Sequence, residues 1–275
     1  MWEKILYNVI LGVVQGVTEF LPVSSSGHLV ITHNLFGFEE PQLFVDIVLH
    51  VGTLIAVLLF LWKDVCDITI GFIKGAVDIL RGNKNVYKES STFRMGIYII
   101  IATIPTGIMG ILLKDWFESL FGSIGMVGFF LLITGGILFF TKYYLHREKK
   151  EINIIDVILL GIVQGCAICP GISRSGITIS TGIYRGIDPV KAAKFSFLIS
   201  IPAIIGATLV QCKDVVSFSS TDIGYVLIGF FVSIIAGYCS LVLLLKLVRA
   251  YKLYYFSFYC WSVGLIIIIY MLMKQ

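Results

Sequence analysis

A glutamate, three serines and a histidine lie close together near the start of the chain, in the segment GVVQGVTEFLPVSSSGH at 12–28. Glu19 follows Gln15 by four residues, so a helix would place both side chains on one face. A carboxylate within reach of a hydroxyl can take its proton and turn it into a nucleophile. Ser25 or a neighbouring serine could be the nucleophile in such a scheme, with Glu19 or His28 as its base.

A second segment, GIVQGCAICPGISRSG at 161–176, repeats the first without its acid and carries Arg174 instead. At a fixed offset of 149, residues 12–27 and 161–176 are identical at seven of sixteen positions. Arginine is well suited to clamp phosphate, and the free amides of a helix N-terminus attract anions. The two segments together therefore predict a phosphate-binding site. The hydroxyls and glycines expected to line it are Ser24, Ser26, Gly27, Ser173, Ser175, Gly176 and Thr178.

The composition is that of an integral membrane protein. The chain has 275 residues, of which 57% are hydrophobic and 14% charged, and its mean hydropathy is +0.94. A soluble domain carries about 25% charged residues, so this chain has too few to cover a water-soluble globule. The net charge is only +4 and no basic cluster alternates with aromatic residues, which argues against nucleic acid as a partner. The six cysteines lie mostly in apolar runs, and we expect them to pack as small hydrophobic residues.

Six apolar runs of about 20 residues are long enough to cross a bilayer as helices. They cover residues 43–62, 93–113, 121–141, 193–210, 223–246 and 254–273. Two further apolar segments, 5–35 and 152–185, are interrupted in the middle, where Pro22 and Pro170 end a helix. Each of these segments predicts a re-entrant helical hairpin whose turn lies inside the protein. A short interfacial helix is expected at 67–80.

One hairpin and three spans make up each half, and three spans bring the second half to the opposite face of the membrane. We therefore expect a single all-α integral membrane domain over 1–275 with an inverted-topology repeat, the first half at about 1–141 and the second at about 152–273. In this arrangement one face carries sixteen of the 21 Lys and Arg residues, and the other carries only four. The face rich in Lys and Arg is expected to be cytoplasmic, which places both termini and the first hairpin on the outer side of the membrane.

The segments GVVQGVTEFLPVSSSGH and PGISRSG resemble the BacA/UppP family of undecaprenyl-diphosphate phosphatases. So do FVDIVLHVGTLIAV at 44–57, ATIPTGIMGILLKDWFESLF at 102–121 and FSFLISIPAIIGA at 195–207. The resemblance implies a multi-pass enzyme of the bacterial cytoplasmic membrane. Such an enzyme hydrolyses undecaprenyl diphosphate, a polyprenyl diphosphate lipid, to the monophosphate and phosphate at the outer face. The reaction recycles the lipid carrier for cell-wall synthesis and confers bacitracin resistance.

The resemblance also implies four catalytic residues, which are Glu19, Ser25, His28 and Arg174. The pattern leaves open whether Ser25 or His28 attacks phosphorus, and we favour Ser25 with Glu19 as its base. The resemblance further implies a divalent cation, Mg2+ or Ca2+, held by Glu19 and Gln15. Gln15 stands where the family has Glu or Gln, which leaves fewer charges for the metal and makes Glu19 more important. Near the C-terminus, FYCWSVG at 258–264 lacks the arginine that often follows the tyrosine, and this departure bears only on a peripheral contact.

Several alternatives stay open. Glu19 and Arg174 could form a purely structural ion pair. Transporters also use inverted repeats with broken helices, so a transporter or lipid flippase for an anionic, phosphorylated substrate is the second candidate function. Asp46 and His50 are one turn apart in the first span and could line the cavity, but we expect them to pair with each other near the membrane interface. A homodimer is compatible with the sequence as well.

Overall fold

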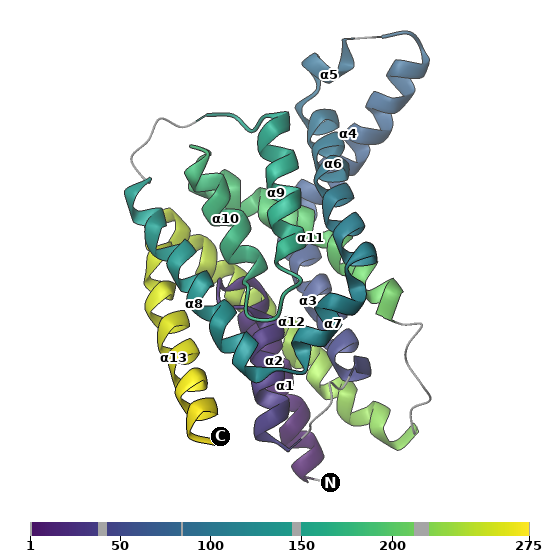
Figure 1. Ribbon diagram of the computed structural model, residues 1–275. Coiled ribbons are helices and arrows are strands. Elements are labelled where there is room, and N and C mark those ends of the chain that lie inside the picture. Colours follow the sequence, from purple (N-terminus) through teal and green to yellow (C-terminus); the bar gives the residue numbers. More distant parts are fainter. Residues whose placement is uncertain (1, 38–42, 84, 145–149, 212–219, 275) are drawn as a thin grey trace.

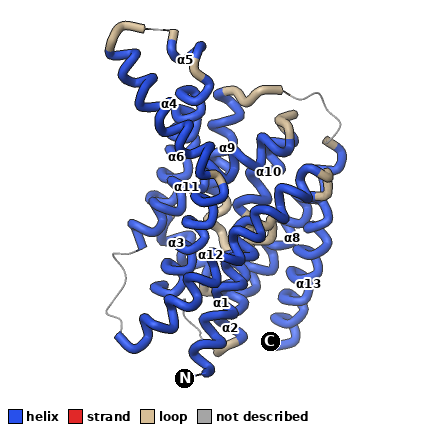
Figure 2. The backbone as a smooth tube through the Cα atoms, turned by 180° about the vertical axis from the view of Figure 1, so that it is seen from behind, coloured by secondary structure: helices blue, strands red, loops and turns tan. Residues whose placement is uncertain are grey.

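The computed structural model describes residues 2–37, 43–83, 85–144, 150–211 and 220–274. Within these ranges the protein is a bundle of helices without a β-strand (Figure 1 and Figure 2). The helices are α1 (Trp2–Phe20), α2 (Ser25–Leu35), α3 (Leu43–Phe60), α4 (Trp62–Leu80), α5 (Val86–Glu89), α6 (Ser91–Leu112), α7 (Lys114–Phe121), α8 (Ile124–Phe140), η1 (Thr141–Tyr143), α9 (Ile154–Cys166), α10 (Arg174–Tyr184), α11 (Pro189–Gln211), α12 (Ser220–Arg249), η2 (Leu253–Tyr255) and α13 (Phe256–Lys274).

Six helical segments of the described residues are long and apolar enough to cross a membrane. They cover Leu43–Phe60, Ser91–Leu112, Ile124–Tyr143, Pro189–Gln211, Ile223–Arg249 and Leu253–Met273. These segments confirm the six predicted spans, with ends that differ by at most four residues. The helix expected at 67–80 is longer than predicted, since α4 starts at Trp62, directly after the first span, and its interfacial placement stays a prediction. Together with α5 it projects from one end of the bundle (Figure 1).

Two further pairs of helices, α1 with α2 and α9 with α10, lie among the spans. The two helices of the first pair are joined by residues 21–24, which we call the first turn. Those of the second pair are joined by residues 167–173, which we call the second turn. Each turn ends in a serine, Ser24 or Ser173, whose hydroxyl accepts an amide hydrogen bond from the next helix. In Figure 1, α1 starts at the end of the molecule that holds the N-terminus, and α9 starts at the opposite end. The placement of both pairs in a membrane, and with it the inverted repeat, stays a prediction.

The first helix of each pair packs against a span from the other half of the chain, since α1 lies along α12 and α9 lies along α6. This close approach requires glycine. A Cβ atom on Gly16 would lie 2.6 Å from the Cβ of Ala236, and one on Gly161 would lie 2.3 Å from the carbonyl oxygen of Ala102. The two halves therefore interlock, and the space between the two turns is built from both.

A buried carboxylate, Asp156, ties together the base of the second helix pair. Its side chain has no exposed surface and accepts hydrogen bonds at 2.8 Å from Lys150 Nζ and from Arg185 Nε. The backbone amide of Asn153 donates a third, at 3.1 Å, in a capping box at the start of α9. Burial alone would raise the pKa of Asp156, but these hydrogen bonds outweigh it and hold the pKa below its ordinary value.

We expect Asp156→Asn to destabilise the protein, because Lys150 and Arg185 then lose their anionic partner. The cost is about 2 kcal/mol, less than for a fully buried pair since both basic side chains are more than a third exposed. Thermal unfolding in detergent should show a fall in Tm of roughly 4–8 °C. The carboxylate has a lowered pKa, so its contribution is present above about pH 4 and is lost as the pH falls through the pKa of the folded state.

The matched control is Asp64→Asn. Asp64 pairs with Lys194 at 3.0 Å, but both side chains are more than 40% exposed, so the change should cost less than about 1 kcal/mol. Equal losses for the two variants would contradict a specific role of Asp156.

Candidate active site

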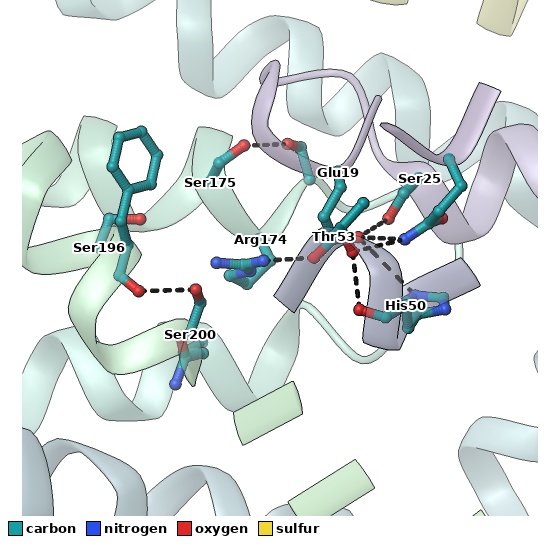
Figure 3. A network of polar contacts seen from close by, with 12 residues as sticks. Glu19, Ser25, His50, Thr53, Arg174, Ser175, Ser196 and Ser200 are labelled. Carbon is teal, nitrogen blue, oxygen red and sulfur yellow. Dashed lines mark hydrogen bonds and ion pairs between the residues drawn. The ribbon is translucent and has the colours of Figure 1, made fainter. Parts of the chain in front are cut away.

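Glu19 ends α1 in the interior of the molecule, where it is 7% exposed. Its Oε1 atom accepts a hydrogen bond at 2.5 Å from Nη2 of Arg174, the first residue of α10. Figure 3 shows the guanidinium directed at this carboxylate. The acid of the first segment and the base of the second therefore meet, as the sequence predicts.

The other carboxylate oxygen of Glu19, Oε2, lies among groups from α1, α2 and α3. Ser25 Oγ donates to it at 2.7 Å, and Gln15 Nε2 donates to it at 2.9 Å. His50 Nε2 lies 3.7 Å from the same oxygen, and the hydroxyl of Thr53 is 3.4 Å from Gln15 Nε2 (Figure 3). The proton of Ser25 is thus within direct reach of a carboxylate whose charge is balanced by a guanidinium.

The first turn has a strained residue, Ser24, with φ of 70° and ψ of 98°. Residues other than glycine rarely adopt a positive φ, and such strain is common at functional sites. The Ser24 hydroxyl accepts hydrogen bonds from the amides of Gly27 at 3.3 Å and Gly171 at 3.0 Å. Because Gly171 belongs to the second turn, this one hydroxyl joins the two turns.

The second turn is held by Thr134 of α8. The threonine hydroxyl donates to the carbonyl oxygen of Gly171 at 2.8 Å and accepts from the amide of Ser173 at 3.1 Å. Ser173 then caps α10 by accepting from the amide of Gly176 at 3.0 Å. These bonds fix the backbone directly before Arg174, and so fix where its guanidinium points.

Gly171→Ala should destabilise the protein. Gly171 has φ of +103°, and an added Cβ would lie 2.5 Å from the carbonyl oxygen of Val127. Strain and overpacking together should cost at least about 2 kcal/mol, measured as a lower Tm in detergent. Gly136→Ala in α8 is the control, because a Cβ there meets no atom within 4 Å. A variant at Gly171 as stable as the one at Gly136 would show that the second turn tolerates a side chain.

A cavity of about 30 Å³ lies between the turns. Its lining residues are Thr18, Glu19, Ser24, Ser25, Ser26, Ala167, Ile172, Ser173 and Arg174. This volume holds one or two water molecules, not a diphosphate. The structure therefore describes a closed site, which must widen to admit a substrate of that size.

The remaining candidate residues lie around this cavity without lining it. Gly27 packs against the second turn, and Ser175 donates to the carbonyl oxygen of Leu21 at 3.3 Å. Thr178 is buried one turn into α10, where its hydroxyl lies 2.6 Å from that of Ser196. His28 faces α13, with Nε2 at 2.8 Å from the hydroxyl of Tyr259.

Two buried polar atoms at the site have no hydrogen-bond partner among the described residues: Arg174 Nη1 and Gln15 Oε1. The first is a cationic donor suited to a phosphate oxygen. The second is a neutral oxygen next to the Glu19 carboxylate, and such oxygens are the ligands that Mg2+ and Ca2+ prefer. In the described ranges, no group of three His, Cys, Asp or Glu side chains could hold a metal ion. The residues present thus fit a divalent cation that takes its other ligands from phosphate and water.

Three contacts of the site were not predicted. His50 was expected to pair with Asp46, but the Asp46 carboxylate lies 2.9 Å from His33 Nε2, and His50 lies beside Glu19. The position of His50 within a spanning run could have predicted its contact with Glu19, since ionisable residues in such runs usually face the protein interior. The sequence does not distinguish Thr53 and Thr134 as site residues, because threonine hydroxyls in spanning helices most often donate to the backbone of their own helix.

The fold defines a multi-pass helical membrane protein, and its site joins a buried glutamate to a half-buried serine and a half-buried arginine. A family model described as bacitracin resistance protein BacA matches residues 8–266, so the chain belongs to this family. The chain is 43% identical over 270 residues to the undecaprenyl-diphosphatase of Methanosphaera stadtmanae, covering 96% of this chain and 97% of the relative. It is 44% identical over 270 residues to the undecaprenyl-diphosphatase of Alkaliphilus metalliredigens, covering 96% and 98%.

Proposed function

We propose that this protein hydrolyses undecaprenyl diphosphate to undecaprenyl phosphate and phosphate. The relatives with this printed name match almost the whole chain at about 40% identity, and bacitracin resistance fits the family. The observation that carries the proposal is the geometry of Glu19. One of its oxygens lies 2.7 Å from the Ser25 hydroxyl, and the other holds Arg174 at 2.5 Å. A carrier of anionic substrates has no need for an activated hydroxyl beside the anion clamp.

In the proposed reaction, the terminal phosphate of the lipid lies between the two turns. Glu19 takes the proton of Ser25 as the serine oxygen forms a bond to the terminal phosphorus. The bond from that phosphorus to the bridging oxygen breaks, undecaprenyl phosphate leaves with the electron pair, and Glu19 gives the serine proton to the leaving oxygen. Water then attacks the phosphoserine while Glu19, again a carboxylate, accepts one of its protons. The bond from phosphorus to the serine oxygen breaks, inorganic phosphate is released, and Glu19 returns that proton to the serine oxygen.

Arg174 stabilises the charge that develops on the phosphoryl oxygens in both steps. Its free Nη1 atom can bind a phosphate oxygen while Nη2 stays on Glu19. Glu19 and the Oε1 atom of Gln15 would hold the divalent cation, which when bound neutralises phosphate oxygens. The N-terminal amides of α10, directly after the second turn, supply further positive potential for an anion.

The proposed orientation places both termini and the opening of the first turn outside the cell, at the face poor in Lys and Arg. The lipid carrier would then be recycled at the outer face of the membrane. A reporter enzyme that folds only outside the cytoplasm should be active when fused to the C-terminus. Activity only when the fusion is made to the connection between α4 and α5, next to Arg81, would reverse the proposed orientation.

The test of the function uses the purified full chain in detergent with a C55 prenyl diphosphate. We expect release of one phosphate per lipid, loss of release in EDTA, and recovery with added Mg2+ or Ca2+. Undiminished release in EDTA would remove the cation from the proposal. If the reconstituted chain moves labelled lipid across vesicles without releasing phosphate, the transporter or flippase function replaces the enzyme.

A further inference from the structure

Tyr259 in α13 reaches the first turn through one imidazole. Its hydroxyl lies 2.8 Å from His28 Nε2, and the two rings are nearly parallel, at 13° with centroids 5.6 Å apart. The other ring nitrogen, Nδ1, lies 2.8 Å from the backbone carbonyl oxygen of Ser24. The backbone N–H of His28 also donates to this carbonyl oxygen, at 3.2 Å, so three hydrogen bonds connect residues 259, 28 and 24.

These contacts fix the tautomer of His28. A backbone carbonyl oxygen can only accept, so Nδ1 must carry the proton. In the neutral ring Nε2 then holds the lone pair, and the Tyr259 hydroxyl donates to it. The one basic position of the ring is occupied and directed at α13. The imidazole is accordingly not placed to attack phosphorus or to take the proton of Ser25, whose hydroxyl lies on Glu19 at 2.7 Å.

The carbonyl group that His28 binds belongs to the strained residue. Ser24 has φ of 70°, and Ser25 follows it directly. The amides of Gly27 and Gly171 hold the Ser24 side chain, while His28 holds its backbone oxygen. Relaxation of Ser24 to a negative φ would turn the next residue and move the Ser25 hydroxyl away from Glu19.

We propose that Tyr259 is a positioning residue for Ser25 and that it acts through His28. Tyr259 keeps Nε2 in the accepting form, and His28 clamps the strained backbone that aims the serine. His28 is on this account a clamp of the first turn, and neither the nucleophile nor the base. The inference rests on the phosphatase function proposed above, and it assigns the last helix a part in the geometry of the site.

The decisive comparison is His28→Asn against His28→Ala. The asparagine amide can donate to the Ser24 carbonyl group in place of Nδ1, but it has no nucleophilic or basic nitrogen. We expect kcat for phosphate release within about tenfold of wild type for His28→Asn, and a loss of about 100-fold or more for His28→Ala. Equal, near-complete loss in both variants, with both proteins folded by thermal unfolding, would overturn the clamp and make His28 a catalytic group.

Tyr259→Phe removes only the hydroxyl. We expect kcat to fall about threefold to tenfold while KM for the lipid stays within about twofold, because one neutral hydrogen bond is lost and no substrate contact changes. In the His28→Asn background the same change should have no further effect. Tyr238→Phe, a change of the same kind on the exposed face of α12, is the control and should leave kcat at the wild-type value. An unchanged kcat in Tyr259→Phe would overturn the proposal.

A spectroscopic measurement tests the contact without substrate. In protein labelled with 15N-histidine, the His28 signals are assigned by their loss in His28→Asn. We expect the Nδ1–H tautomer in the wild type, and a shift of the Nε2 resonance in Tyr259→Phe. The Nε2–H tautomer would overturn the proposal. Wild-type protein that releases no phosphate would instead overturn the proposed function, and the two failures are therefore distinguishable.

Discussion

Glu19→Gln should lower kcat for phosphate release by about 10³-fold. The amide keeps the size of the side chain and can still accept the Ser25 hydrogen bond through its oxygen. It cannot take the serine proton, and it leaves the Arg174 guanidinium without its carboxylate partner at 2.5 Å. Since the loss affects proton transfer more than binding, KM for the lipid should change much less than kcat.

The measurement is steady-state phosphate release from a C55 prenyl diphosphate by purified variants in one detergent. Glu118→Gln is the matched control, because Glu118 is exposed and pairs with Lys114 on its own helix, at 3.5 Å. The control should retain the wild-type rate. A Glu19→Gln enzyme with near wild-type kcat would show that Glu19 has a structural part only, as in the alternative of a plain ion pair.

Arg174→Lys should lower kcat by about 10³-fold and raise KM, although it keeps the positive charge. A lysine has one ammonium group, whereas Arg174 uses Nη2 for Glu19 and has Nη1 left for a phosphate oxygen. The single ammonium group of a lysine cannot hold the Glu19 carboxylate and a phosphate oxygen in these two directions at once. Free guanidinium ion should restore part of the activity of Arg174→Ala, because it fits the space that the side chain leaves.

Arg94→Lys controls for the general effect of such a change, since Arg94 lies near one end of α6 and donates only weakly to the carbonyl oxygen of Tyr87, at 3.4 Å. Its kcat should stay at the wild-type value. An Arg174→Lys enzyme that keeps both kcat and KM would contradict the role of the guanidinium as the phosphate clamp.

The spans and the meeting of Glu19 with Arg174 were predictable because the signals are local. A run of about 20 apolar residues has few alternatives to a spanning helix. Glu19 comes just before the proline-broken first turn, and Arg174 comes directly after the second. An ionised group in an apolar segment needs a partner of opposite charge, and each of these two residues was the best candidate for the other. The structure confirms both, with the ion pair at 2.5 Å.

The neighbours of this pair could not be predicted in the same way. The spacing of Asp46 and His50 shows that they share one face of α3, but not which helices cover that face. Tyr7 and His33 cover the outer part, where Tyr7 is 2.7 Å from His33, and Glu19 covers the part next to His50. For the same reason, no contact of Tyr259 with the first turn was predicted. Contacts between helices that are far apart in the chain depend on packing shape, which the apolar pattern of one helix does not contain.

The distance in sequence between Glu19 and Arg174 has a consequence for biogenesis. The two residues are 155 positions apart, so at 5–20 residues per second the ribosome adds the arginine roughly 8–30 s after the acid. During that interval the nascent first half carries a carboxylate into the membrane with no guanidinium to meet it, at a cost of several kcal/mol if ionised. The contact between Glu19 and Arg174 can therefore form only after α10 has been synthesised and inserted, so the first half of the chain cannot complete the site alone.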